Sequence, residues 1–107
     1  MSDFAETLRG TGLKIANDAP PLKVFKYVFE GGITDDYTIS MPQGAELLHV
    51  GLQHGRICLW ARVNPGAKMV DYHFRLVGTG HDGADGRYLG TVFFHSGDLV
   101  FHIFALD

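Results

Sequence analysis

Apolar and polar residues alternate along most of this chain, from Leu22 onward, and short turns that contain glycine interrupt the alternation. Residues 56–63 and 98–104 are typical segments. Because successive side chains of a strand point to opposite faces of a sheet, a period of two indicates β-strands. The pattern predicts a small all-β domain over residues 22–107, preceded by an N-terminal arm or short helix over residues 1–21.

The positions of the turns divide the domain into seven short strands. They are expected over residues 22–29, 37–41, 46–53, 56–63, 70–78, 87–95 and 98–106. The spacings His54-Gly55 and Ser96-Gly97 are typical of tight two-residue hairpins. Turns between successive strands predict an antiparallel meander, closed as a barrel or folded as a sandwich.

A turn at His54-Gly55 also predicts a register, in which residue 53 opposes residue 56 and residue 50 opposes residue 59. One face of this hairpin is then apolar and belongs to the core. Its members are Leu48, Val50, Leu52, Ile57, Leu59 and Ala61. The opposite face carries Gly51 and Cys58 among larger polar and aromatic side chains.

The outward face of the central strands is the first candidate binding surface. Its predicted members are His49, Arg56, Trp60, Arg62, His73 and Arg75. Arginine forms bidentate hydrogen bonds to carboxylate or phosphate, and tryptophan offers a ring for stacking. Gly51 would let a ligand approach the backbone. We expect an anion-binding platform here; the simpler alternative is that Trp60 packs under a neighbouring segment and the arginines only solvate the sheet.

The glycine-rich segment 78–86 is the second candidate and could serve as a flap. Its polar members are Thr79, His81, Asp82 and Asp85. Backbone N–H groups of glycines can cradle phosphate, but such loops normally open a helix, whereas this segment leads into a strand. The same residue types are also typical of a flexible connection.

The last predicted hairpin is apolar on both faces. Its second face holds Leu89, Phe93, Val100 and Phe104 around a pair formed by Thr91 and His102. Exposed aromatic and aliphatic side chains of this number form a patch of the kind that marks an interface. We expect a second subunit to cover this face and the chain to form a homo-oligomer; the alternative is that the N-terminal arm covers it.

Composition narrows the function further. The chain has 107 residues and a formal net charge of -3, which fits one domain and argues against general nucleic-acid binding. The single cysteine, Cys58, allows no internal disulfide, and the six histidines lack the spacing of a metal site. We therefore expect no metal and no cofactor. Because a signal peptide and a long apolar run are both missing, we also expect a protein of a reducing cytoplasm with no membrane contact.

Several segments in this order resemble a family of short uncharacterised proteins of tailed phages and prophages. They are residues 23–27 (KVFKY), 38–45 (TISMPQGA), 57–61 (ICLWA), 74–81 (FRLVGTGH), 90–92 (GTV) and 99–102 (LVFH). The resemblance covers residues 23 to 104. It implies a phage setting and a single compact domain, and it assigns no catalytic residue. Together with the expected cytoplasmic location, the phage setting predicts the cytoplasm of the host bacterium.

Three hypotheses on function remain open. The favoured one is a non-enzymatic binding protein that counters host defence or inhibits a host factor. It would sequester an anionic small molecule, such as a nucleotide signal, or block a host protein. The second is an accessory of the virion or of its assembly. The third is a small hydrolase that uses His81 with Asp82 or Cys58 with His49.

Overall fold

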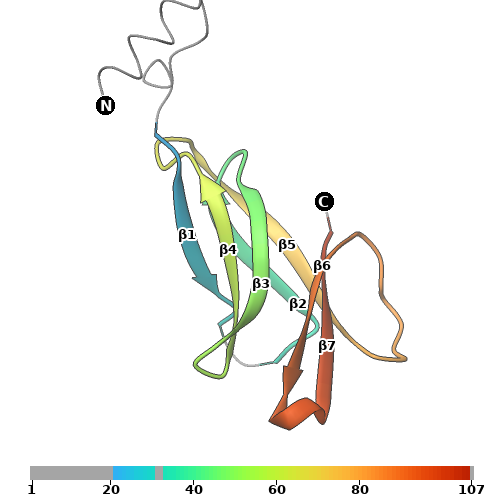
Figure 1. Cartoon of the computed structure of the whole chain (residues 1–107). Helices are drawn as coiled ribbons and strands as arrows, with labels where there is room; N and C mark the ends of the chain where they lie inside the picture. Colours follow the sequence, from blue (N-terminus) through green and yellow to red (C-terminus); the bar gives the residue numbers. More distant parts are fainter. Residues whose placement is uncertain (1–20, 31–32, 107) are drawn as a thin grey trace, which may run out of the picture.

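The computed structural model describes residues 21–30 and 33–106, which form two antiparallel β-sheets (Figure 1). The strands are β1 (Lys23–Val28), β2 (Asp36–Pro42), β3 (Glu46–Gln53), β4 (Arg56–Val63), β5 (Met69–Gly78), β6 (Arg87–Phe94) and β7 (Leu99–Ala105). Sheet A has the strand order β1-β4-β3, and sheet B has the order β2-β5-β7-β6. The prediction of an all-β domain is confirmed.

The predicted meander is wrong. Of the strands that follow one another in sequence, only β3 with β4 and β6 with β7 are hydrogen-bonded neighbours. β1 pairs with β4, β2 pairs with β5, and the chain changes sheet after β1, β2 and β4. The two sheets do not close into a barrel. Alternation sets which face of each strand is apolar, but it does not set which strand lies beside it.

Both sheets contribute to one core, as in a sandwich. Leu59 of sheet A and Phe74 and Ile103 of sheet B are fully buried. The ring of Phe29, just after β1, lies 5.6 Å from the ring of Phe74. β3 and β6 also approach closely, since a Cβ built on Gly90 would lie 3.6 Å from Val50 Cβ. The edge of each sheet therefore lies against the other sheet on this side.

The first hairpin has the predicted register. Gln53 opposes Arg56 and Val50 opposes Leu59. His54 and Gly55 both have positive φ, 54° and 75°, as the two central residues of a type I′ turn require. Farther along, a bulge between Leu47 and His49 shifts the register.

That bulge overturns the prediction for Leu48. Leu47 instead opposes Ala61 and packs against the core, and Leu48 is 45% exposed. A bulge places two residues opposite one, so the alternation reverses beyond it. The core side of β3 therefore changes from even-numbered to odd-numbered residues.

The second hairpin turn is wider than predicted. Phe94 opposes Leu99, so the connection has the four residues 95–98 rather than Ser96-Gly97 alone. His95, Ser96 and Gly97 have φ of 50°, 57° and 96°. Three successive residues in the left-handed region are unusual outside glycine, and they widen the turn.

The predicted arm over residues 1–21 lies almost wholly outside the described residues. Within the part of the chain that is described, no helix is both long and apolar enough to cross a membrane. The expected homo-oligomer and the alternative of an arm over the last hairpin stay predictions.

The partly buried phenol of Tyr27 on β1 leads us to expect that the free energy of unfolding falls at alkaline pH. Burial raises the pKa of its phenol above 10.0, because a low-dielectric environment disfavours the phenolate. The unfolded chain then releases this proton at a lower pH than the folded chain does. The free energy of unfolding should fall as pH rises above about 10. Urea unfolding at pH 8 and pH 11 should show a smaller fall in Tyr27→Phe than in the wild type; equal falls would contradict the assignment.

Candidate binding surfaces and cavities

Four of the six residues of the predicted platform share the outer face of sheet A. Arg56, Trp60 and Arg62 come from β4, and His49 comes from β3. The register places His49 opposite Trp60, and their ring centroids are 5.8 Å apart. The first hairpin therefore positions these side chains as the sequence predicted.

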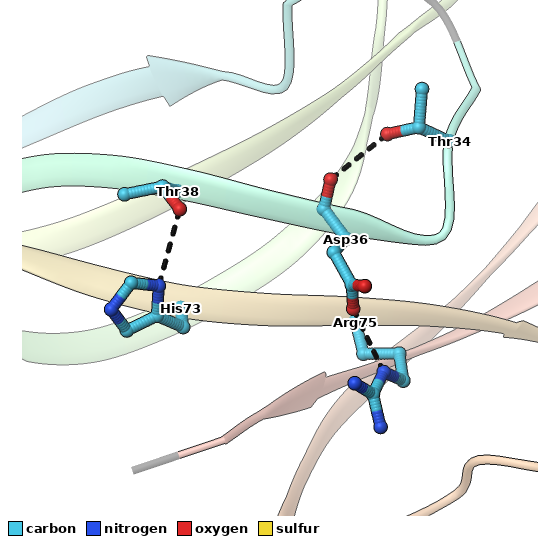
Figure 2. A network of polar contacts seen from close by, with 5 residues as sticks. All are labelled: Thr34, Asp36, Thr38, His73 and Arg75. Atoms are coloured by element: carbon cyan, nitrogen blue, oxygen red, sulfur yellow. Dashed lines mark hydrogen bonds and ion pairs between the residues drawn. The ribbon is translucent and has the colours of Figure 1, made fainter.

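His73 and Arg75 lie elsewhere, on β5 of sheet B, so the predicted six-residue platform is wrong. Figure 2 shows both side chains engaged by β2: Asp36 Oδ1 accepts from Arg75 Nε at 2.8 Å, and Thr38 Oγ1 is 3.1 Å from His73 Nδ1. The chain passes to the other sheet after Val63, which separates β5 from β4. The prediction had placed the strand with His73 and Arg75 beside β4 on the basis of alternation alone, which does not show which strands are neighbours.

Each of the three arginines of the predicted platform forms an ion pair with a carboxylate. Arg56 Nη2 pairs with Glu30, Arg62 pairs with Glu46 through both Nε and Nη2, and Arg75 pairs with Asp36. All but Arg75 have side chains that are about half exposed or more, so the pairs contribute little to stability. They do cancel most of the local positive charge. The outer face of sheet A is therefore less attractive to an anion than the arginine count suggested.

The backbone at Gly51 is not open to a ligand. A Cβ built there would lie 2.9 Å from His49 Nε2, so the imidazole already occupies this space. Next to it, Cys58 is only 1% exposed. Lys26 and Gln53 lie on the strands flanking β4, and Lys26 Nζ donates to Gln53 Oε1 at 2.7 Å across it. The thiol proposed as a nucleophile with His49 is thus covered.

The glycine-rich segment contributes to a large open cavity, called here the loop cavity. It has a volume of about 760 Å³ and lies between this segment and the start of β2. It brings together two predicted groups, since Arg75 lines it with His81 and Asp82. Gly83 packs against Arg75, because a Cβ built on Gly83 would be 3.4 Å from Arg75 Cδ. Thr79 and Asp85 are not among its lining residues.

The charge of the loop cavity is unfavourable for an anion. Asp36, through a hydrogen bond and its charge, raises the pKa of the Arg75 guanidinium, and Asp85 and Asp35 add smaller effects of the same sign. Asp35 and Asp82 also line the cavity. Carboxylates thus outnumber the cationic groups, and Arg75 is a cross-strand partner of Asp36 rather than a free anion receptor.

A second cavity, called here the hairpin cavity, lies between the turns of the two hairpins, which point to the same end of the domain (Figure 1). Its volume is about 310 Å³. Its lining residues are Phe29, Ile33, Tyr37, Gly55, Arg56, Ile57, Phe94, His95 and Leu99. Of the predicted platform, only Arg56 reaches it. No motif or spacing in the sequence indicated this cavity, because its walls come from four separate segments.

The outer face of the β6–β7 hairpin exposes aromatic side chains. Phe93 is 59% exposed and opposes the half-buried Val100. Tyr88 is 57% exposed and opposes Phe104, with ring centroids 5.7 Å apart. Between these two pairs lies the predicted pair of Thr91 and His102.

Hydrogen bonds fix His102 at the centre of this face. Its Nδ1 is 2.9 Å from Thr91 Oγ1, and its Nε2 is 2.8 Å from Thr79 Oγ1. The Tyr88 hydroxyl is 2.6 Å from Thr91 Oγ1. Thr79, predicted as part of a flap, is thus a partner of the β6–β7 face.

Leu89 does not belong to that face. A bulge between Tyr88 and Gly90 shifts the register, and Leu89 packs against the core. Tyr88 takes the outward position in its place. As at Leu48, the extra residue reverses the alternation, which a reading of the sequence as a regular strand could not show.

Among the residues that the structure describes, no group of three or more His, Cys, Asp or Glu side chains could hold a metal ion. All buried side-chain N and O atoms of the described residues have hydrogen-bond partners.

The chain belongs to the family described as "Domain of unknown function (DUF7352)", whose model matches residues 21–107. This match covers the β domain and agrees with the predicted membership of an uncharacterised family; the phage or prophage origin stays a prediction. No curated protein and no solved structure matches the chain.

Proposed function

We propose that this member of the DUF7352 family is a non-enzymatic binding protein that acts through protein–protein contacts, among them self-association. The observation that carries the proposal is the β6–β7 outer face, where Tyr88 and Phe93 are each more than half exposed. Aromatic side chains are enriched at the centres of protein interfaces.

Burial of this face by a partner would leave few polar groups unsatisfied. Both ring nitrogens of His102 already have threonine partners, and Thr91 also bonds to the Tyr88 hydroxyl. Losing the hydrogen bonds of a buried polar group is costly, whereas a group that keeps its partners can be covered at little cost. We propose a second copy of this chain as the partner on this face.

Blocking of a host protein is the better-supported form of the binding function. Every arginine expected to hold a nucleotide has a carboxylate partner, so sequestration of a highly charged anion has little electrostatic support. In this proposal the outer face of sheet A, with His49 and Trp60, contacts the host protein in the cytoplasm of the infected bacterium. The phage setting comes from the sequence resemblance. A virion accessory is the second candidate, because assembly proteins also need exposed apolar faces.

Replacing Phe93 with serine tests the proposed self-association. We expect a dimer or small oligomer in the wild type and at least tenfold weaker association in Phe93→Ser, because an aromatic group at the centre of the face is lost. Sedimentation velocity over a concentration series measures this. Leu48→Ser is the matched control, since Leu48 is 45% exposed but lies on β3. A monomeric wild type, or equal association in both variants, would refute it.

The host-protein contact needs a separate experiment. Untagged wild type and Trp60→Ala should be compared for host proteins retained after infection, and particles should be purified in parallel. Loss of one stoichiometric partner in Trp60→Ala supports blockade through sheet A. Recovery of the chain in purified particles, with no host protein retained, supports the virion accessory.

A further inference from the structure

We infer that the hairpin cavity binds a small carboxylic acid with an apolar body. Its volume of about 310 Å³ lies at the lower end of the range of small-molecule sites, about 300–1,000 Å³. This site is separate from the β6–β7 outer face, so it stands or falls independently of the proposed self-association.

The walls of the cavity suit the apolar body. Phe29 and Ile57 come from the side of sheet A, and Phe94 and Leu99 come from the second hairpin. Leu99 is 45% exposed although it faces this space. An aromatic or branched aliphatic group placed here would remove these side chains from water, which is the main source of affinity in such sites.

An acid can use the Arg56 guanidinium directly, whereas an amine finds no carboxylate among the lining residues; because Glu30 pairs with Arg56, this preference rests on exchange of an exposed ion pair and not on a net positive charge. Arg56 is the fixed cation among the lining residues, and none of them is a carboxylate. Among the described residues, Glu30 alone engages the guanidinium, through Nη2, so Nε and Nη1 stay available. Because both partners are more than half exposed, Arg56 can share its bond with a ligand at small cost. Its planar donors match the two oxygens of a carboxylate.

The turn of the second hairpin forms one wall of the cavity, to which His95 contributes. Its imidazole is a second polar group among the lining residues, beside Arg56, and can bond to the carboxylate.

Three probes of the same shape and different charge test the inference. They are 4-phenylbutyrate, 4-phenylbutanol and 4-phenylbutylamine, each titrated into ¹⁵N-labelled full-length protein and followed by NMR. We expect the acid to bind most tightly and the amine most weakly. The largest shifts should fall on the amides of Gly55, Ile57 and Leu99. Leu99→Trp, which fills the cavity, should weaken the acid and the alcohol alike.

Arg56→Gln separates the charge from the cavity. It should weaken binding of the acid about tenfold, as loss of a charged hydrogen bond does, and leave the alcohol unchanged. Arg62→Gln is the matched control, because Arg62 has a similar exposed pair with Glu46 but does not line the cavity. The inference is overturned if no probe binds, if the amine binds as well as the acid, if both arginine variants behave alike, or if the shifts cluster at Arg75 and His81 or at Phe93.

Discussion

Gly86→Ala is expected to lower the free energy of unfolding by roughly 2–6 kcal/mol, through strain of the left-handed backbone and overpacking. Gly86 has a φ of +88°, and a Cβ built there would lie 2.2 Å from the carbonyl oxygen of Ala105. That oxygen belongs to the backbone of β7, so it cannot move aside like the end of a flexible side chain. The strand pair β6–β7 would have to separate at its base.

Gly80→Ala is the matched control for this prediction. Gly80 has the same φ of +88°, but nothing lies within 4 Å of a Cβ built there. Only the backbone strain applies, so we expect a loss of about 1 kcal/mol. Urea unfolding of both variants measures the difference. Equal losses would show that Ala105 is not the obstacle and that the base of the β6–β7 pair is looser than described.

Phe74→Ala is the second change with a large expected effect, a loss of about 3–5 kcal/mol. Phe74 is fully buried on β5, and its ring lies 5.6 Å from that of Phe29. Truncation would leave a cavity where the two sheets meet. Since domains of this kind are stable by only about 5–15 kcal/mol, this loss removes a large share of the stability. The variant should unfold at a markedly lower temperature in calorimetry and at a lower urea concentration; wild-type values would show that Phe74 does not fill the space between the sheets.

Phe93→Ala gives the contrast within the same residue type. Its ring is 59% exposed, so in the monomer the change should stay within about 0.5 kcal/mol. Measurement at low protein concentration excludes any contribution from self-association. A loss as large as that of Phe74→Ala would mean that Phe93 is packed within the fold, and the β6–β7 outer face could not then be an interface.

Local pattern predicted the strands well where they are regular. The turn at His54-Gly55 fixed the first hairpin register through the positive φ that both positions accept. The prediction from local pattern was wrong at two bulges, where it assigned Leu48 and Leu89 to the wrong face. One extra residue reverses the alternation there, and the hydrophobicity pattern does not reveal that residue.

The candidate site was likewise predicted correctly where its residues lie on one local hairpin and wrongly where they lie on distant strands. His49, Trp60, Arg56 and Arg62 share a face because one hairpin carries them, and that hairpin is a local structure. His73 and Arg75 were misplaced because their strand lies in the other sheet. The carboxylate partners Glu30 and Asp36 come from 26 and 39 residues away along the chain. Such distant pairs have no sequence spacing by which they could be recognised.

By itself, the sequence determined the all-β class, the positions of the strands and the face that each regular strand turns to the core, since these depend on a two-residue period and on turn residues. Only the tertiary structure decided which strands lie side by side, how the charges of the arginines are cancelled, and where the hairpin cavity opens. These depend on contacts between segments far apart in the chain. Many such arrangements bury the same apolar faces, so the pattern of a single strand cannot select among them.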